Sequence, residues 1–356
     1  MRQNFTHLFL NEQAEGNVRV EGFAKIGEWI RRVMQYRKFG RTGWQVSDIG
    51  YGMWGMGSWS GSDDQESLRA LQRAVDLGCN FFDTAFAYGN GRSENLLGQI
   101  VRANPSKKLY TATKIPPKNM QWPALPENTL DECYPADHIE EFLHKSLENA
   151  GLESFDLLQL HTWNDDWAGD TSWSDKFDDL KRQGLINACG ISINRWEPWN
   201  GIKAVRSGKI DSVQVIYNIF DQNPEDELFP ACREMDVAVI ARVPFDEGTL
   251  TGALTKNTTF PDDDWRHVYF KPENLIPSVE RAEALKHLVP AGSTLPEMAL
   301  RFILSEPTVS TIIPGMRSLT HVGSNIAASD AGSLSGDLLD VLHGHRWVRK
   351  PAPWSA

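Results

Sequence analysis

Four side chains with complementary chemistry stand at or just after the ends of apolar runs. Asp83 closes FFD, Tyr88 follows it five residues later, Lys114 closes YTATK and His161 closes LLQLH. A phenol with a pKa of about 10 is a poor acid near neutral pH, but an adjacent ammonium stabilises the phenolate. We therefore expect Lys114 to lower the pKa of Tyr88, Asp83 to hold Lys114 in place, and His161 to orient a carbonyl group. This set predicts carbonyl reduction, in which a hydride reaches carbon and a proton reaches oxygen.

These residues belong to a repeated alternation of strands and helices that begins after Met34. Helical periodicity marks stretches such as 65–77 and 138–150 between eight apolar runs, which are 46–51, 80–83, 109–113, 157–161, 188–191, 212–216, 237–242 and 310–313. Runs without polar alternation indicate parallel strands buried on both faces. Eight such units predict an α/β protein with a (β/α)8 TIM barrel, where reacting groups gather at the carboxyl ends of the strands.

Three segments lie outside the eight units. The sequence around the turn 40–43 predicts an N-terminal β-hairpin, and a long connection follows strand 7, with an expected loop at 255–277 and a helix at 278–289. Helices are also expected at 319–329 and 336–342. The predicted domains are an N-terminal extension over 1–33, a barrel over 34–345 and a C-terminal tail over 346–356. The extension is either upstream of the natural start at Met34, and poorly ordered, or a real N-terminal helix.

The composition excludes several classes of protein. Among 356 residues, 41% are hydrophobic and 23% charged, so the chain is not disordered, and its net charge of −11 argues against nucleic acid as a partner. No run approaches the ~18 apolar residues of a membrane helix, and no signal-peptide core is present. The four cysteines form no C-x-x-C pair, which predicts reduced thiols in the cytoplasm and no metal site. The expected partner is a small-molecule carbonyl or alcohol substrate, and no oligomeric state is assigned.

The order of the motifs carries a family resemblance. DTAFAYG at 83–89, RSE at 92–94, TK at 113–114 and LH at 160–161 together resemble the aldo-keto reductases, and the likeness extends over 34–328. The resemblance implies a barrel that binds a nicotinamide dinucleotide without a Rossmann domain. It also implies that Tyr88 is the general acid, that Lys114 and Asp83 support it, and that His161 orients the carbonyl.

The same resemblance implies a set of cofactor-binding residues. Ser192 and Gln214 match the contacts to the carboxamide, Arg242 takes the position that stacks on nicotinamide, and the loop with Gly248 and Leu250 matches the one over the pyrophosphate. The segment around the adenosine ribose and its 2′-phosphate supplies Gly315, Arg317, His321 and Asn325. The family often has Asn where Ile193 stands, and here Asn194 follows one place later. Arg317 offers a cation for a 2′-phosphate, which favours NADP(H), with NAD(H) as the alternative.

Tryptophans follow most of the predicted strands. Trp54, Trp163 and Trp265 are predicted to line an apolar substrate pocket, although each could instead pack a loop onto the barrel. One motif points elsewhere: Gly50 to Gly55 satisfies the G-x-G-x-x-G pattern of a Rossmann dinucleotide site. Because no helix follows it directly, we assign it to the first loop of the barrel.

The sequence therefore predicts an NADP(H)-dependent reductase of aldehydes or ketones. Two alternatives stay open. One is an NAD-dependent dehydrogenase that oxidises a sugar or alcohol, and the other is a nicotinamide-binding subunit that senses redox state.

Overall fold

Eight parallel strands form one sheet in the computed structural model, which describes residues 34–57, 61–262 and 264–350. The strands are β3 (Tyr51–Gly52), β4 (Phe81–Asp83), β5 (Tyr110–Ile115), β6 (Phe155–Leu160), β7 (Ile186–Ser192), β8 (Ser212–Ile216), β9 (Ala238–Arg242) and β10 (Val309–Ile312). Each pairs with the next in chain order, and parallel bridges from Ile49 to Ile312 and from Gly52 to Gly315 join the first strand to the last. The predicted (β/α)8 barrel is confirmed. The predictions for 1–33 and for 351–356 of the tail lie outside the described residues.

The order of the strands rules out the Rossmann alternative. A Rossmann sheet reverses its strand order at a switch point, whereas here neighbours in the sheet are always neighbours in sequence. Gly50 and Gly52 instead give the backbone room. A Cβ on Gly52 would lie 2.5 Å from the carbonyl oxygen of Ile313, so glycine at this position lets the first strand close against the last.

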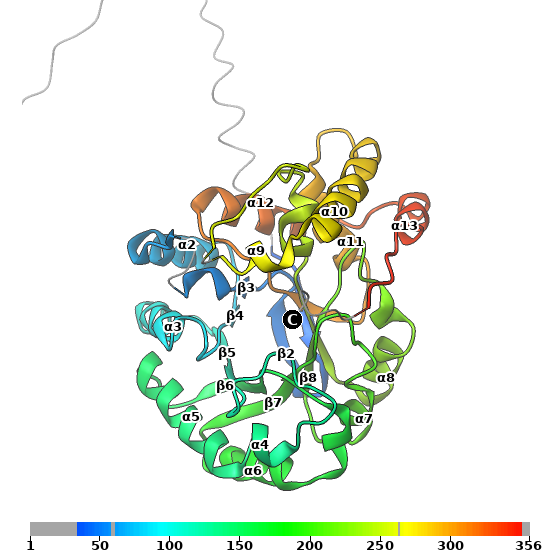
Figure 1. The fold of residues 1–356 in the computed structure, drawn as a ribbon. Helices are drawn as coiled ribbons and strands as arrows, with labels where there is room; N and C mark the ends of the chain where they lie inside the picture. Colours follow the sequence, from blue (N-terminus) through cyan, green and yellow to red (C-terminus); the bar gives the residue numbers. More distant parts are fainter. Residues whose placement is uncertain (1–33, 58–60, 263, 351–356) are drawn as a thin grey trace, which may run out of the picture. The chain divides into compact units, whose positions relative to one another are not determined.

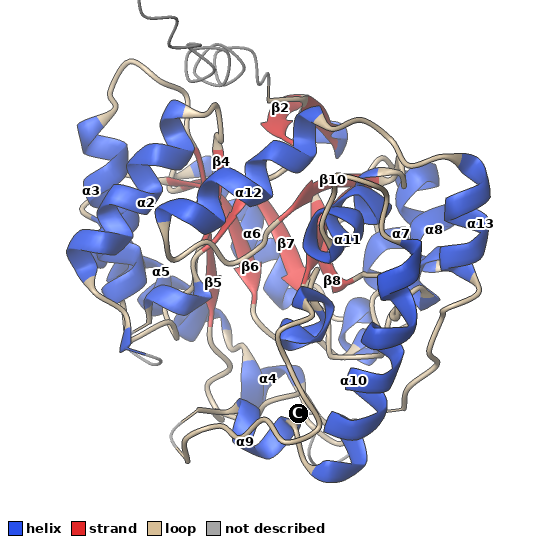
Figure 2. Ribbon diagram, turned by 90° about the horizontal axis from the view of Figure 1, so that it is seen from above, coloured by secondary structure: helices blue, strands red, loops and turns tan. Residues whose placement is uncertain are grey.

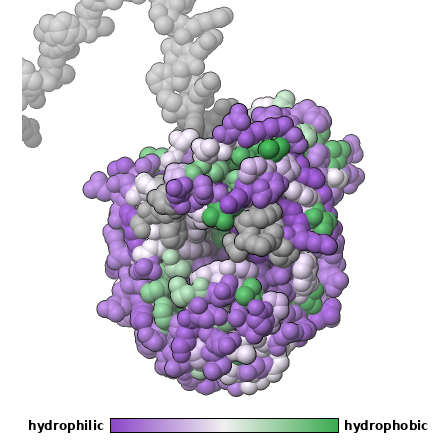
Figure 3. Space-filling view, in the orientation of Figure 1, coloured by the Kyte–Doolittle hydropathy of each residue, from purple (hydrophilic) through white to green (hydrophobic). Residues whose placement is uncertain are grey.

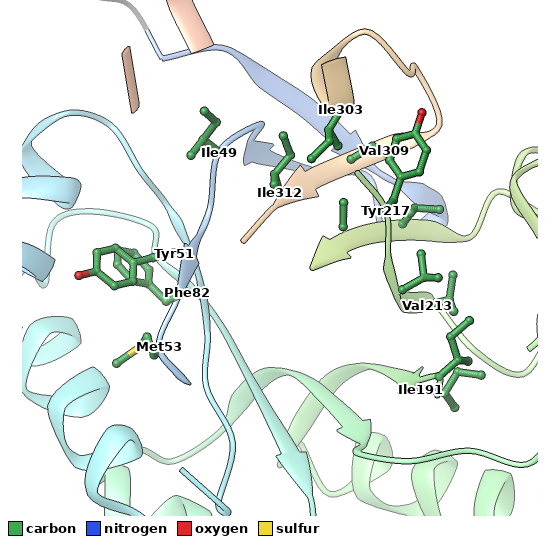
Figure 4. Close-up of a cluster of buried hydrophobic side chains, with 14 of the residues drawn as sticks. Ile49, Tyr51, Met53, Phe82, Ile191, Val213, Tyr217, Ile303, Val309 and Ile312 are labelled. Carbon is green, nitrogen blue, oxygen red and sulfur yellow. The ribbon is translucent and has the colours of Figure 1, made fainter. Parts of the chain in front are cut away.

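Helices surround the strands in Figure 1. They are α2 (Asp64–Asp76), α3 (Arg92–Ala103), α5 (Ala136–Ala150), α6 (Ser172–Arg182), α7 (Ile202–Arg206), α8 (Leu228–Met235), α11 (Leu295–Leu304) and α12 (Leu319–Asp330). The apolar faces of these helices bury residues such as Leu71 and Leu143 against the outer faces of the strands. Figure 4 shows part of this layer, where Ile303 of α11 lies near Val309 and Ile312 of β10. The apolar layer between helices and strands therefore holds the strands of the barrel in place.

The predicted hairpin is present and closes the amino end of the barrel. It consists of β1 (Tyr36–Phe39) and β2 (Trp44–Ser47), paired antiparallel. Phe39 stacks on Trp44 and also packs on Phe81 of β4, with ring centroids 5.5 and 5.3 Å apart. In Figure 2, β2 lies at the opposite end of the barrel from α4 (Leu130–Cys133), α9 (Arg266–Tyr269) and α10 (Pro272–Leu285). A ligand therefore has to enter at the carboxyl end.

The connection after β9 corrects one prediction. We expected a loop to 277 and a helix from 278, because proline usually ends a helix. Instead, α10 begins at Pro272 and runs through Pro277. Proline suits the first helical turn, and Pro277 removes one further backbone bond near the helix start while Leu275, Val279 and Ala282 are buried. A last helix, α13 (Gly336–His343), follows α12.

Figure 3 shows a largely hydrophilic face on which hydrophobic residues form small separate groups. Among the described residues, no helix is both long and apolar enough to cross a membrane.

Candidate active site

A buried lysine joins three of the predicted residues at the carboxyl end of the barrel. Lys114 is fully buried, and its Nζ lies 2.5 Å from Asp83 Oδ1, 2.8 Å from the carbonyl oxygen of Thr84 and 3.4 Å from Tyr88 Oη. Asp83 of β4 pairs with Ala112 of the adjacent parallel strand β5, and Lys114 lies two residues further along β5 on the same face. An uncompensated charge would be costly here, so the ion pair and the phenol form one unit.

The charges of this unit differ from the prediction in one respect. Burial lowers the pKa of Lys114, but Asp83 and Tyr88 outweigh that effect and raise it above its ordinary value. Burial raises the pKa of Tyr88, and although the charge of Lys114 opposes this, the net shift is upward. Lys114 lowers the pKa of Tyr88 as expected, but the cost of burying a phenolate outweighs this contribution. Tyr88 therefore holds its proton at neutral pH.

His161 completes the group and is neutral. Its ring lies edge-on to Tyr88 and to Trp122, with centroids 5.6 and 4.6 Å away. Burial, Lys114 and Arg242 hold the pKa of His161 well below its usual range. Its Nδ1 is buried without a hydrogen-bond partner. Since a buried N–H without an acceptor is rarer than a buried acceptor without a donor, we assign the proton to Nε2.

Two glutamines hold the second oxygen of Asp83. Gln214 Nε2 and Gln159 Nε2 donate to Asp83 Oδ2 at 2.9 and 3.2 Å. Gln214 was expected at the cofactor carboxamide, and Gln159 was missed. The sequence did hold a signal for Gln159: it stands two residues before His161, and residues i and i+2 of a strand face the same side.

The RSE motif supports the loop that carries Tyr88. Ser93 Oγ accepts a hydrogen bond from Thr84 at 2.7 Å, and Glu94 accepts one from Thr113 of β5 at 2.6 Å. Gly89 has φ of +71°, and a Cβ there would lie 2.7 Å from the carbonyl oxygen of Gly57. These contacts tie α3 to β4 and β5, which fixes the turn between Asp83 and Tyr88.

The three predicted nicotinamide contacts lie on neighbouring strands. Ser192 ends β7 opposite Gln214 of β8, and Arg242 ends β9. Arg242 is half-buried, and its Nη2 donates to the carbonyl oxygen of Ile193 at 3.1 Å. Burial and the charge of Arg195 lower the pKa of Arg242 to about 10, so it remains a cation at neutral pH.

The loop with Gly248 and Leu250 is already internally bonded. It forms a 3-10 turn over Asp246–Thr251, in which the amides of Gly248 and Leu250 donate to the carbonyl oxygen of Phe245 at 3.0 and 2.9 Å. The side chain of Leu250 is fully buried in the core. Both amides are therefore used within the turn.

The residues predicted at the adenosine end surround the start of α12. Gly315 bridges to Gly52, and Ser318 caps the helix by accepting a hydrogen bond from the amide of His321. Arg317 and His321 are exposed, whereas Asn325 is buried. Arg317 packs across Gly55, where a Cβ would lie 2.8 Å from its Cδ. A helix N-terminus beside an arginine favours a bound phosphate.

Several unpartnered buried polar atoms lie at this end of the barrel. Within the described ranges, the buried atoms without a hydrogen-bond partner include His161 Nδ1, Asn194 Oδ1, Arg242 Nε and Thr249 Oγ1. These atoms come from the ends of β6, β7 and β9 or from the loops that follow them. Since buried polar groups are normally hydrogen-bonded, their presence here fits a polar ligand such as a nicotinamide dinucleotide.

Two of the three tryptophans predicted to line the pocket lie together. Trp54 is 39% exposed and lies edge-on to Trp265, with centroids 6.4 Å apart. Trp163 is instead fully buried between Trp167 and Trp173, and its Nε1 donates to Asp165 at 3.0 Å. This placement corrects the assignment of Trp163, which packs a loop onto the barrel. Trp122, beside His161, was not among the predicted pocket residues.

Comparisons with known proteins agree on one family. The model described as the Aldo/keto reductase family matches residues 48–343. The chain is 27% identical over 301 residues to an NADH-specific methylglyoxal reductase of Escherichia coli, covering 81% of this chain and 91% of that protein. It is 28% identical over 304 residues to the Schizosaccharomyces pombe aldo-keto reductase yakc, whose name carries NADP(+), covering 82% of this chain and 86% of that protein.

A solved structure has the same fold. The holo form of the aldo-keto reductase AKR11C1 from Bacillus halodurans superposes with a TM-score of 0.72 at 24% identity, covering 91% of this chain and all of that one.

Proposed function

The chain belongs to the aldo/keto reductase family of oxidoreductases, and we propose that it reduces a small aldehyde or ketone with NADPH, using Tyr88 as the general acid. The observation that carries this proposal is the contact of Lys114 Nζ with both Asp83 and Tyr88 Oη. A phenol that is held protonated beside a buried ammonium can give up a proton when negative charge develops next to it.

Each residue of the site has a separate role in the proposed reaction. Ser192 and Arg242 would hold the nicotinamide end of the dinucleotide, and Arg317 with the start of α12 would hold the phosphate end. The bound dinucleotide supplies the hydride. His161 donates from Nε2–H to the carbonyl oxygen and orients it. Tyr88 donates its proton to the same oxygen as negative charge develops there, and Lys114 stabilises the phenolate that remains.

The preference for NADPH rests on Arg317. Arg317 is exposed and directly precedes Ser318, the N-cap of α12, and both a cation and a helix N-terminus favour a bound phosphate. Arg317 and the N-terminus of α12 would both attract the 2′-phosphate of NADPH, whereas the uncharged 2′-hydroxyl of NADH would be attracted only weakly. The relative named as NADP(+)-using supports this choice, while the NADH-specific relative makes NADH the competing cofactor to test.

Replacing Tyr88 by Phe tests the proposal. We expect Tyr88→Phe to lower the kcat for aldehyde reduction by about 10²–10⁴-fold, the usual contribution of a general acid, with NADPH binding retained. Tyr36→Phe is the matched control, because Tyr36 is 47% exposed and lies on the hairpin at the opposite end of the barrel. Reduction by Tyr88→Phe at the wild-type rate would refute the assignment.

A further inference from the structure

The C-terminal segment after α13 returns to the carboxyl end of the barrel. In Figure 1 it is the red chain that leaves α13 and runs back toward the strands. Arg349, near the end of the described chain, is only 6% exposed. Its Nη2 donates to Asp246 Oδ1 at 2.8 Å and also to Asp221, and its Nε donates to Asp221 Oδ1 at 3.3 Å. One guanidinium therefore joins the loop after β8 to the loop after β9.

Aromatic rings and backbone bonds hold this arginine in place. The guanidinium lies 4.6 Å from the ring of Trp196 and 4.6 Å from the ring of Trp347. The amide of Trp347 donates to the carbonyl oxygen of Phe220 at 2.8 Å. A planar guanidinium against two rings, with Nε and Nη2 on carboxylates and Nη1 on the hydroxyl of Tyr269, is geometry that lysine cannot reproduce.

The loop that Arg349 contacts is conformationally strained. Asp246 and Glu247 have φ of +46° and +56°, a region that residues with a Cβ seldom occupy. Such a conformation persists only when its surroundings hold it. Arg349 pairs with Asp246, and Arg195 pairs with Glu247 at 2.8 Å. Two arginines from outside the loop thus fix its two strained acidic residues.

Of the two ion pairs that hold the turn, the pair of Arg349 with Asp246 matters more, because Arg349 neutralises two carboxylates. Asp221 and Asp246 are 7% and 1% exposed, so without Arg349 two carboxylates would face each other in a buried site. Removal of one partner from a buried ion pair leaves an uncompensated charge, and here it would leave two. To lower the cost of these two buried charges, the loops after β8 and β9 would have to move apart or take in water.

We propose that Arg349 is a positioning residue that fastens the C-terminal segment to the Asp246–Thr251 turn and thereby slows the release of the dinucleotide. The proposal rests on the proposed function, and it takes the dinucleotide to lie against the Asp246–Thr251 turn, where Thr249 Oγ1 is buried without a hydrogen-bond partner. It has a second consequence: the guanidinium neutralises two carboxylates that would otherwise repel the pyrophosphate.

The test compares Arg349→Met, Arg349→Lys and the control Arg346→Met. Arg346 lies on the same segment and pairs with Asp226 in an exposed ion pair, so its loss removes a tail arginine without touching the turn. NADPH is bound to each full-length protein, and its dissociation is followed by stopped-flow fluorescence after a chase with excess NADP+. We expect release from Arg349→Met to be about tenfold faster than from wild type, as for loss of one buried charged hydrogen bond, with Arg349→Lys intermediate and Arg346→Met unchanged.

The dependence of NADPH association on ionic strength distinguishes a positioning role of Arg349 from a general loosening of the fold. In Arg349→Met the charges of Asp221 and Asp246 are no longer neutralised, so NADPH association should be slower at low ionic strength, and the deficit should shrink at high salt. Wild-type release and association rates in a folded Arg349→Met would overturn the proposal while leaving the proposed function intact. If that variant does not fold, a wild-type release rate in Arg349→Lys overturns it. Failure of the wild-type protein to bind either dinucleotide would overturn both.

Discussion

The side-chain amide of Gln214 lies on Asp83, with Nε2 donating to Oδ2 at 2.9 Å, while Lys114 takes Oδ1. Asp83 is thus bonded on both oxygens, and the position of its partner Lys114 depends on a residue 131 positions beyond Asp83 in the chain. Family resemblance assigns Gln214 to the cofactor, whereas the structure gives it a role in orienting the carboxylate.

Replacing Gln214 by Leu separates these two roles. If Gln214 mainly orients Asp83, Gln214→Leu should lower kcat by about tenfold through the lost charged hydrogen bond, with little change in the Kd for NADPH. Gln159→Leu is the matched comparison and should have a smaller effect, since its bond is longer, at 3.2 Å. A weaker Kd with an unchanged kcat would show that the cofactor contact is the main role.

The pH dependence of reduction follows from Tyr88 and His161. Reduction needs protonated Tyr88, whose pKa is raised by burial above its ordinary value of 10.0, so the rate should fall only as the pH rises through that higher value. Reduction also needs neutral His161, whose pKa lies well below 6.5. We therefore expect kcat/KM for reduction to be level from about pH 6.5 to 9. Alcohol oxidation needs the phenolate and should rise with pH over the same range. A reduction profile with a midpoint between about pH 7 and 8 would contradict the assignment.

Arg317 should control the choice of cofactor. Arg317→Ala should weaken NADPH binding by about tenfold or more, through loss of a charged contact to the 2′-phosphate, and should leave NADH binding unchanged. Gly55→Ala provides an independent check, because its Cβ would lie 2.8 Å from Arg317 Cδ and displace that side chain. Tryptophan fluorescence titration with both cofactors measures these effects. Equal weakening for NADPH and NADH would instead place Arg317 away from the 2′-phosphate.

The two tryptophans Trp163 and Trp54 should behave differently. Trp163→Ala removes a fully buried indole and should lower the free energy of unfolding by about 3–5 kcal/mol, measured by urea titration. Trp54→Ala, at an exposed site beside Trp265, should change the KM for aldehydes with little effect on stability. A large change in KM from a stable Trp163→Ala would restore its place in the substrate pocket.

Much of the site could be predicted because barrel topology is encoded locally. Apolar runs and helical periodicity identify strands and helices, and the carboxyl ends of parallel strands meet at one end of a barrel. Asp83, Lys114 and His161, each at or next to the end of its strand, therefore had to converge. The hairpin was equally local, since two short apolar runs flank a turn of glycines.

The sequence by itself determined the family, the barrel and the group around Lys114, since these follow from residue order and short-range pattern. Only the tertiary structure decided that Gln159 and Gln214 share one oxygen of Asp83, that Trp163 is buried, and that Arg349 reaches Asp246 across 103 positions. It also decided the sign of the pKa shift at Tyr88. Each of these depends on distance and burial between segments remote in sequence, and the energies of buried charges and hydrogen bonds are set by those distances rather than by local pattern.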